Sequence, residues 1–337
     1  MEDKDIFETQ WEQELPPENE MKQIQKSIRK RNWKIVSVSV LLAAAILLVS
    51  VFGIIPAVEQ LYWNADEYSY GHRSDLEATL YAYTQLFNPE HDTTILNYRH
   101  TGFASYDLEL RLLSRTGQDS ISVGGTLVRN QLTMDLFFDD TSVEGHMFWR
   151  HYLRFNEPEE QITDAVRSQL KELPEYIRLE ANLSFREDIT MEELVAFKDK
   201  YPMMRITWVA IRVTEPGTEW TTLCGMSPFN GGSVFDGMYQ DYPYFNIASV
   251  HDAGQVERHF KALLQYSADQ VEMGRGIPRY DDWHIYQNAL DYVEENGVQS
   301  YGVVVMASPE LLLEVMNDEL VILVDPIDGW IDLSMKY

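Results

Sequence analysis

Apolar side chains follow one another without interruption in a single stretch near the N-terminus, whereas the later part of the chain alternates between apolar and polar positions. Residues 35–58 read IVSVSVLLAAAILLVSVFGIIPAV and contain no charged side chain. A helix of 24 residues rises by about 36 Å, which exceeds the roughly 30 Å of a bilayer's hydrocarbon core. The pattern therefore predicts one transmembrane helix.

Two other structures would give a similar apolar stretch. A cleaved signal peptide has an apolar core of about 7–15 residues close to the N-terminus, but here 34 residues precede a longer core. A helix buried in a soluble protein normally carries a polar stripe, and the only polar side chains here are Ser37, Ser39 and Ser50. The transmembrane helix explains the pattern better than either.

The flanking charges predict the orientation of this helix. Basic side chains precede it, whereas the first charges after it are Glu59, Asp66 and Glu67. Because positive charge stays on the cytoplasmic side, residues 1–34 are expected in the cytoplasm and the C-terminal part outside, in a single-pass protein of the cell membrane. Residues that favour the headgroup region are the expected interface anchors, namely Arg31, Trp33, Lys34, Tyr62 and Trp63.

The cytoplasmic segment is short and has few apolar groups. Phe7, Trp11 and Leu15 recur at every fourth position, so a helix would place them on one face. A short isolated helix needs a partner to bury such a face, and these residues are therefore a candidate partner-binding face. A disordered acidic tail is an equally good interpretation of residues 1–20. From Met21 to Lys34 the chain lacks Gly and Pro, and we expect it to extend the membrane helix.

Beyond the membrane, periodicity and capping residues predict both helices and strands. The expected helices are 74–87, 158–173, 190 onward, 252–273, 282–296 and 308 onward. The expected strands are 106–112, 121–123, 131–138, 176–185, 205–214, 300–306 and 320–324, with turns at Gly124-Gly125 and Arg129-Asn130. Residues 217–249 are expected to form a long loop.

These elements predict an α+β fold after the transmembrane helix. The strand, short helix and strand at the C-terminal end suggest a mixed sheet. We divide the outer part into a membrane-proximal α+β region at 59–155 and a C-terminal α+β domain at 156–337, which form one domain or two subdomains.

Charge and cysteine content narrow the function. Of the 54 acidic and 27 basic residues, 46 and 20 lie beyond the span, a net charge of −26. Phosphate would repel such a domain, so we exclude nucleic acid as a partner. Cys224 is the only cysteine, which rules out an internal disulfide and is most simply a buried apolar residue.

Two parts of the chain resemble a known family. They are the basic run Lys30-Arg31-Asn32-Trp33-Lys34 before the span, and the closing residues Tyr301-Gly302-Val303-Val304-Val305, Glu310-Leu311-Leu312, Leu323-Val324-Asp325 and Trp330. They resemble the sigma factor regulator proteins of Firmicutes, which have an N-terminal membrane-anchor region and a C-terminal extracytoplasmic domain. The resemblance implies an anti-sigma factor that controls an extracytoplasmic-function sigma factor. The cytoplasmic segment is short compared with typical inhibitory domains. The resemblance therefore leaves open whether a helper membrane protein takes part in binding the sigma factor.

Motifs for chemistry are missing from the sequence. It contains no Walker loop, GxGxxG, HExxH, GxSxG or CxxC, so we expect no enzyme, cofactor or metal site. His146 and His151 are too irregularly spaced for a metal pair. The acidic pairs Asp139-Asp140 and Asp325/Asp328 are best interpreted as solvated turns. The aromatic loop from Phe229 to Phe245 could line a ligand groove, but core packing is favoured.

The sequence therefore predicts a single-pass membrane regulator of transcription that acts in signal transduction. The expected partners are a sigma factor on the cytoplasmic side and membrane lipid. The alternative is a tethered extracytoplasmic domain that binds a ligand or protein while its cytoplasmic tail is inert.

Overall fold

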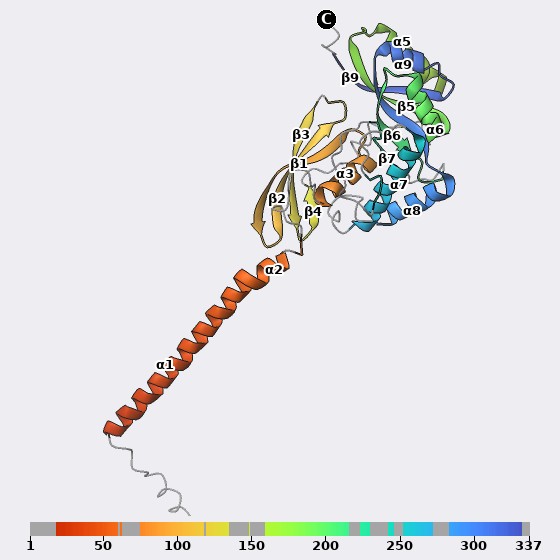
Figure 1. Ribbon diagram of the computed structural model, residues 1–337. Helices are drawn as coiled ribbons and strands as arrows, with labels where there is room; N and C mark the ends of the chain where they lie inside the picture. Colours follow the sequence, from red (N-terminus) through yellow and green to blue (C-terminus); the bar gives the residue numbers. More distant parts are fainter. Residues whose placement is uncertain are drawn as a thin grey trace, which may run out of the picture. The chain divides into compact units, whose positions relative to one another are not determined.

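The computed structural model divides the chain into two compact units, Met1–Leu61 and Tyr62–Tyr337. The structure describes residues 18–59, 61–62, 75–117, 119–134, 148, 159–215, 223–229, 242–245, 252–271 and 283–331. Figure 1 shows the order of the elements along the chain.

One long helix makes up nearly all of the described part of the first unit. Helix α1 (Glu18–Val49) continues through a π-helical turn, η1 (Ser50–Ile54), into α2 (Ile55–Glu59). The helix expected at 35–58 is confirmed, and so is its extension through the basic residues 21–34. In η1 the Ile55 N–H donates to the Ser50 carbonyl, five residues back. This wider turn lies directly before Pro56, whose missing N–H interrupts the regular α-helical ladder.

The second unit begins with a helix and a four-stranded sheet. Helix α3 (Asp75–Phe87) precedes strands β1 (His91–Gly102), β2 (Ser105–Ser114), β3 (Ser120–Val128) and β4 (Gln131–Met134). The strands pair antiparallel in the order β1-β2-β3-β4. Along β2, side chains alternate between buried and exposed, which is the period-two pattern that identified this strand in the sequence.

The sequence predicted three strands of this sheet, missed the fourth, and placed one of two turns correctly. Strand β1 was missed, because half of it is exposed at the sheet edge and shows no alternation. Gly124-Gly125 lies inside β3 and forms no turn. The turn at Arg129-Asn130 is confirmed, with φ values of +50° and +65° at its two residues, as a tight hairpin of the right twist requires.

The second sheet is formed by the C-terminal half. Its strands are β5 (Ile177–Thr190), β6 (Arg205–Ile211), β7 (Gly225–Met226), β8 (Gln299–Ala307) and β9 (Val321–Ile331). The helices of this region are α5 (Glu159–Glu172), α6 (Met191–Lys200), α7 (Ala253–Asp269), α8 (Trp283–Asn296) and α9 (Pro309–Val315).

This sheet is antiparallel, which corrects the expected mixed sheet. The strand order is β7-β6-β8-β5-β9, and β5 pairs antiparallel with both β8 and β9. Strands β8 and β9 do run parallel, as their connecting helix α9 suggested, but β5 is inserted between them. Likewise β8 separates β5 from β6. The units β5-α6-β6 and β8-α9-β9 thus each have a strand of the other unit between their two strands. Together they form the ferredoxin-like βαββαβ topology, with β7, α7 and α8 inserted before β8.

Capping residues define several of these helices. Thr190 and Glu193 form a complete capping box at α6, and Ser308 caps α9 with Pro309 in its first turn. Asp252 caps α7. This helix ends at Asp269, earlier than the expected end at 273.

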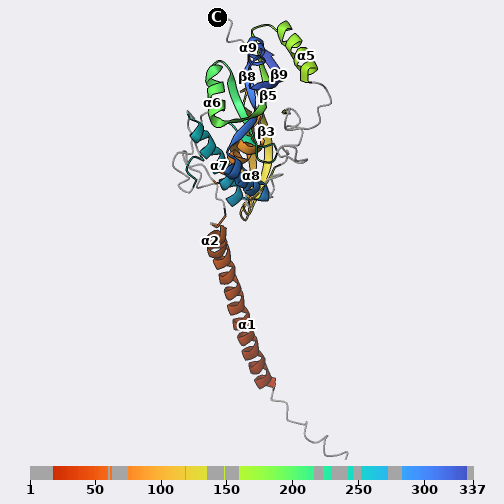
Figure 2. The same ribbon diagram turned by 90° about the vertical axis from the view of Figure 1, so that its right-hand side faces the viewer.

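The two faces of the second sheet are packed differently. Helices α6 and α9 cover the face that belongs to the main core, where Phe197 and Leu312 pack in the same cluster as Leu183 and Val303. On the opposite face a small cluster consists of Phe148, Trp208, Ala210, Leu223, Tyr301 and Val304. A Cβ on Gly302 would come within 2.3 Å of the Phe148 ring, so this strand position needs glycine. Figure 2 shows the sheet with α6 and α7 beside it.

Helix α3 connects the two sheets and is buried on all sides. It contacts β1 in the first sheet and β7 and α7 in the C-terminal half, and Figure 1 shows it next to α7. The Gln85 side chain donates to Asp92 Oδ1 at 2.8 Å and accepts from the Ser227 N–H at 2.9 Å. The Gln85 carbonyl accepts from Trp208 Nε1 at 2.8 Å. One residue of α3 thus joins β1, β6 and the end of β7.

Replacing Gln85 by leucine should destabilise the second unit, Tyr62–Tyr337, which we call the outer unit after its expected position. Gln85→Leu removes two side-chain hydrogen bonds and leaves the buried Ser227 N–H without its acceptor, which costs about 2–3 kcal/mol of unfolding free energy. Urea unfolding of the detergent-solubilised chain measures the change. The matched control is Gln265→Leu, on the exposed face of α7, where a change within about 0.5 kcal/mol is expected. Equal stability of both variants would contradict the bridging role.

Candidate functional site

The apolar helix is the most distinctive candidate for a functional element. The helix from Glu18 to Glu59 is long and apolar enough to cross a membrane, and none of its most apolar window is buried within the protein. Large side chains along it are more than half exposed, among them Val38, Leu41, Leu47 and Phe52. Such a continuous exposed apolar surface is costly in water, so the helix fits a bilayer better than an aqueous environment.

The helix carries the expected anchors near its N-terminal boundary. Arg31, Trp33 and Lys34 are exposed, and Trp33 is 68% exposed. One turn of the basic segment is supported by an ion pair, between Lys22 Nζ and Glu18 Oε1 at 2.7 Å. These positions suit a headgroup region, where a basic terminus and an indole ring both interact favourably.

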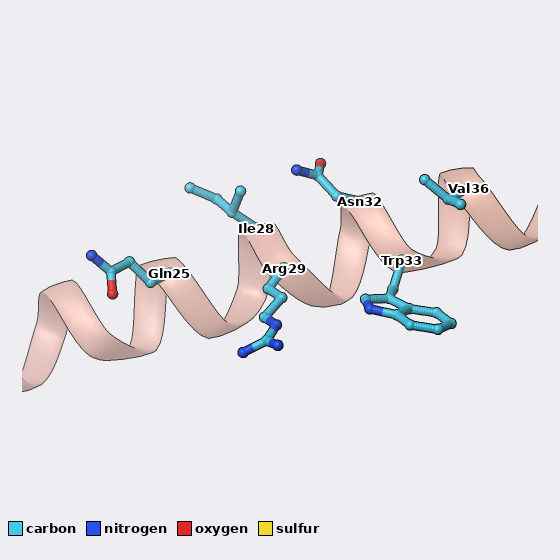
Figure 3. Close-up of a pocket in the computed structure, with 6 residues that line it drawn as sticks. All are labelled: Gln25, Ile28, Arg29, Asn32, Trp33 and Val36. Carbon is cyan, nitrogen blue, oxygen red and sulfur yellow. The ribbon is translucent and has the colours of Figure 1, made fainter.

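A shallow hollow lies along the same segment. Its lining residues all come from α1, namely Gln25, Ile28, Arg29, Asn32, Trp33 and Val36. Figure 3 shows Arg29 and Trp33 on one side of the helix and Ile28 and Asn32 on the other. No second element forms a wall among these residues, so the hollow is a feature of an exposed helix and offers no enclosed small-molecule site.

The far boundary leads directly into the outer unit. Tyr62, an expected anchor, lies at the start of that unit, and its ring packs edge-on against Phe103 at 5.9 Å between centroids. Phe103 lies in the β1–β2 turn and was not among the expected site residues. The remaining expected site residues, Phe7, Trp11, Leu15 and Trp63, lie outside the residues that the structure describes.

Charged groups inside the outer unit form structural contacts. Asp318 accepts from Lys200 Nζ at 2.6 Å, from the Tyr201 hydroxyl at 2.8 Å and from the Leu320 N–H at 2.9 Å. Burial alone would raise the pKa of the Asp318 carboxyl, but these hydrogen bonds outweigh it and lower the pKa below its ordinary value. A satisfied carboxylate of this kind fixes the segment between α9 and β9.

A second buried ion pair lies at the end of β6. Arg212 Nε and Nη2 donate to the two carboxylate oxygens of Asp188 at 2.8 and 2.9 Å, and the guanidinium stacks on the Tyr301 ring at 4.5 Å. This bidentate pair links β6 to β5. The sequence offered no signal for it, because its partners are far apart along the chain.

The described acidic residues do not form a metal site. No group of three or more His, Cys, Asp or Glu side chains that could hold a metal ion occurs among the residues placed by the structure. The interpretation of Asp325 and Asp328 as turn residues was wrong, because both lie in β9, opposite Asn182 and Glu180 of β5. Asp139, Asp140, His146 and His151 lie outside the described ranges.

Aromatic side chains around the long loop pack into the core. Phe245 is fully buried, 4.5 Å from the Tyr266 ring and 5.8 Å from the Tyr81 ring. Phe229 lies against the same core. Core packing is thus confirmed for Phe229 and Phe245, whereas Tyr244 is 43% exposed. Cys224 is also buried, at 2% exposure, and burial raises the pKa of its thiol.

His259 is a buried titratable group that sequence analysis missed. It lies on α7, fully buried, and its Nδ1–H donates to the Tyr244 carbonyl at 2.8 Å. Burial lowers the pKa of His259 from 6.5 to about 4, although hydrogen bonds to the Tyr244 and Phe245 backbone partly oppose this. Its polar neighbours are backbone groups, so it ties α7 to the segment 242–245.

Comparison with known proteins gives one family. Residues 170–322 match the family described as "Sigma factor regulator C-terminal". The matched range begins near the end of α5 and ends just inside β9, so it includes β5 to β8 and α6 to α9 but leaves out most of α5 and β9. Comparison with curated proteins and with solved structures gave no match.

The buried His259 should make stability depend on pH. Between pH 6.5 and about 4 the unfolded chain binds a proton at this position and the folded chain does not. Unfolding free energy therefore falls as the pH is lowered through that window, by about 3 kcal/mol in total. We expect His259→Gln to flatten this part of the stability curve, measured by urea unfolding at pH 4.5, 5.5 and 7. The exposed His284→Gln serves as the control. The same slope in wild type and His259→Gln would contradict the assignment.

Proposed function

We propose that this chain, whose residues 170–322 match the sigma factor regulator C-terminal family, is a single-pass membrane anti-sigma factor. It would control an extracytoplasmic-function sigma factor in response to a signal outside the membrane. The observation that carries the proposal is the presence, in one chain, of this regulatory domain and an exposed apolar helix of membrane-spanning length.

The proposed orientation has the N-terminus in the cytoplasm. Six basic residues lie on α1 before the apolar stretch, and the outer part is strongly acidic. Positive charge next to a span stays on the cytoplasmic side, and anionic lipid headgroups attract it there. The regulator domain then lies outside the cell, and only the short segment before the helix faces the sigma factor.

Phe7, Trp11 and Leu15 are the proposed contact with the sigma factor. They are the large apolar residues of the cytoplasmic tail that recur at helical spacing. One amphipathic helix that docks into a groove is the largest interface such a segment can form. A helper membrane protein would add the contacts that this tail lacks. We also propose that the chain acts by binding and not by catalysis, in keeping with its regulatory family.

The orientation can be tested with a membrane-impermeant maleimide. Ser27→Cys places a thiol on the exposed surface of α1, and Thr126→Cys places one on the exposed face of β3. In intact cells the reagent should label Thr126→Cys and leave Ser27→Cys unlabelled until the cells are opened. The unsubstituted chain is the blank, because Cys224 is buried with a raised thiol pKa. Labelling in the reverse pattern would overturn the orientation.

The tail contact can be tested by purifying the full chain from its native membrane. We expect a sigma factor to co-purify, and Phe7→Ala plus Trp11→Ala to reduce its amount. Loss of about 2 kcal/mol from two aromatic anchors corresponds to roughly a thirtyfold weaker complex. The control is Thr9→Ala plus Gln13→Ala, which changes other positions of the same segment. If no sigma factor is recovered, or both double variants behave alike, direct inhibition by this face is wrong and the tethered binding domain becomes the better interpretation.

A further inference from the structure

Two hairpin turns meet at one end of the first sheet. The β1–β2 turn at 102–105 and the β3–β4 turn at 128–131 lie side by side, because Ser105 is paired with Val128 and the Arg129 N–H donates to the Ala104 carbonyl at 2.8 Å. We call these two turns the hairpin tip. They form one rigid edge, since the antiparallel ladder between β2 and β3 continues directly behind them.

Apolar side chains are exposed on the hairpin tip. Phe103 is 37% exposed and Val128 is 48% exposed. Turn residues of a soluble domain are normally polar, and a phenylalanine at a turn gains nothing from facing water. The tip therefore has a surface that would be more stable in a less aqueous environment.

The covalent chain keeps the hairpin tip close to the membrane helix. Tyr62 packs on Phe103 with 5.9 Å between ring centroids. Tyr62 follows Glu59, the last residue of α2, by three positions along the chain, and three Cα–Cα steps span at most about 11 Å. Phe103 is thus tethered within a short distance of the point where the apolar helix ends.

The hairpin tip also differs from the remainder of the outer part in its net charge. Segments 96–107 and 124–133 contain Arg99 and Arg129 against one acidic residue, Asp107, which is paired with Arg99. The outer part as a whole has a net charge of −26. Anionic headgroups would repel most of that surface but not this edge.

We propose that the hairpin tip docks on the outer surface of the bilayer, with Phe103 and Val128 in the headgroup region beside Tyr62. An aromatic ring with an aliphatic neighbour is suited to that region. The inference goes beyond the proposed function and depends on it only for the insertion of the anchor. The first sheet would then meet the membrane at a second point, in addition to the covalent connection.

Spin labels on introduced cysteines test the proposal, in the full chain held in phosphatidylglycerol–phosphatidylethanolamine nanodiscs. The unsubstituted chain is the blank, because its own Cys224 is buried. Val128→Cys reports on the tip. Ile121→Cys is the matched control, because it is 46% exposed and lies at the opposite end of the same strand. Val40→Cys reports on anchor insertion. We expect collisions with a water-soluble nickel reagent to fall several-fold for Val128→Cys relative to Ile121→Cys, and Phe103→Asp in the Val128→Cys background to restore them.

The outcomes distinguish failure of the proposed docking from failure of the membrane anchor on which it depends. If the Val40→Cys label is shielded from nickel but Val128→Cys and Ile121→Cys are equally accessible, the anchor stands and the docking is wrong. If the Val40→Cys label is accessible, the proposed anchor itself fails. Shielding of Val128→Cys that disappears when each disc holds a single chain would indicate a second copy as the occupant and would overturn the proposal.

Discussion

The outer unit depends on the burial of one short helix between two sheets. Helix α3 has apolar residues on every side, and the polar residues among them are buried as well. A buried amide or hydroxyl is tolerated only when it is hydrogen-bonded, and Gln85 meets this condition by bonding to both sheets at once. The Arg115 guanidinium adds to this arrangement, because it donates to the carbonyls that end α3 and pairs with Asp92. The first sheet and the ferredoxin-like sheet therefore share one core, although they come from different parts of the chain.

Local signals in the sequence predicted most elements and failed on how they combine. The Thr190 capping box, Ser308 with Pro309, and the alternation along β2 act over a few residues, so they can be found without a structure. The insertion of β5 between β8 and β9 follows from pairing between strands more than 100 residues apart, and no local pattern encodes it. Strand β1 was missed for a related reason, since the second half of this edge strand is exposed on both faces and lacks the alternation that burial imposes.

The features of the candidate site also differ in whether a local pattern in the sequence reveals them. The apolar helix and its basic flank depend on composition alone, and the sequence predicted both. Phe103, His259 and the contact between Lys200 and Asp318 depend on distant partners, and a reader of the sequence would see only a turn residue, one histidine among eight and two ordinary charges. The residues proposed to bind a sigma factor stay a prediction, because they rest on spacing in the first 34 residues. The family match covers residues 170–322 of the C-terminal half and no residue of the apolar helix or of the segment before it.

The π-helical turn η1 has a geometric consequence for that connecting helix. A turn of this kind holds one residue more than an α-helical turn, so every side chain after it is rotated by about 100° about the axis relative to an uninterrupted helix. A neighbouring helix that follows one stripe of α1 would meet a different stripe of residues from Ile55 onward. The residues before and after the π-helical turn thus form different faces of the helix. A partner that binds one end of the span in one leaflet need not be the partner that binds the other end.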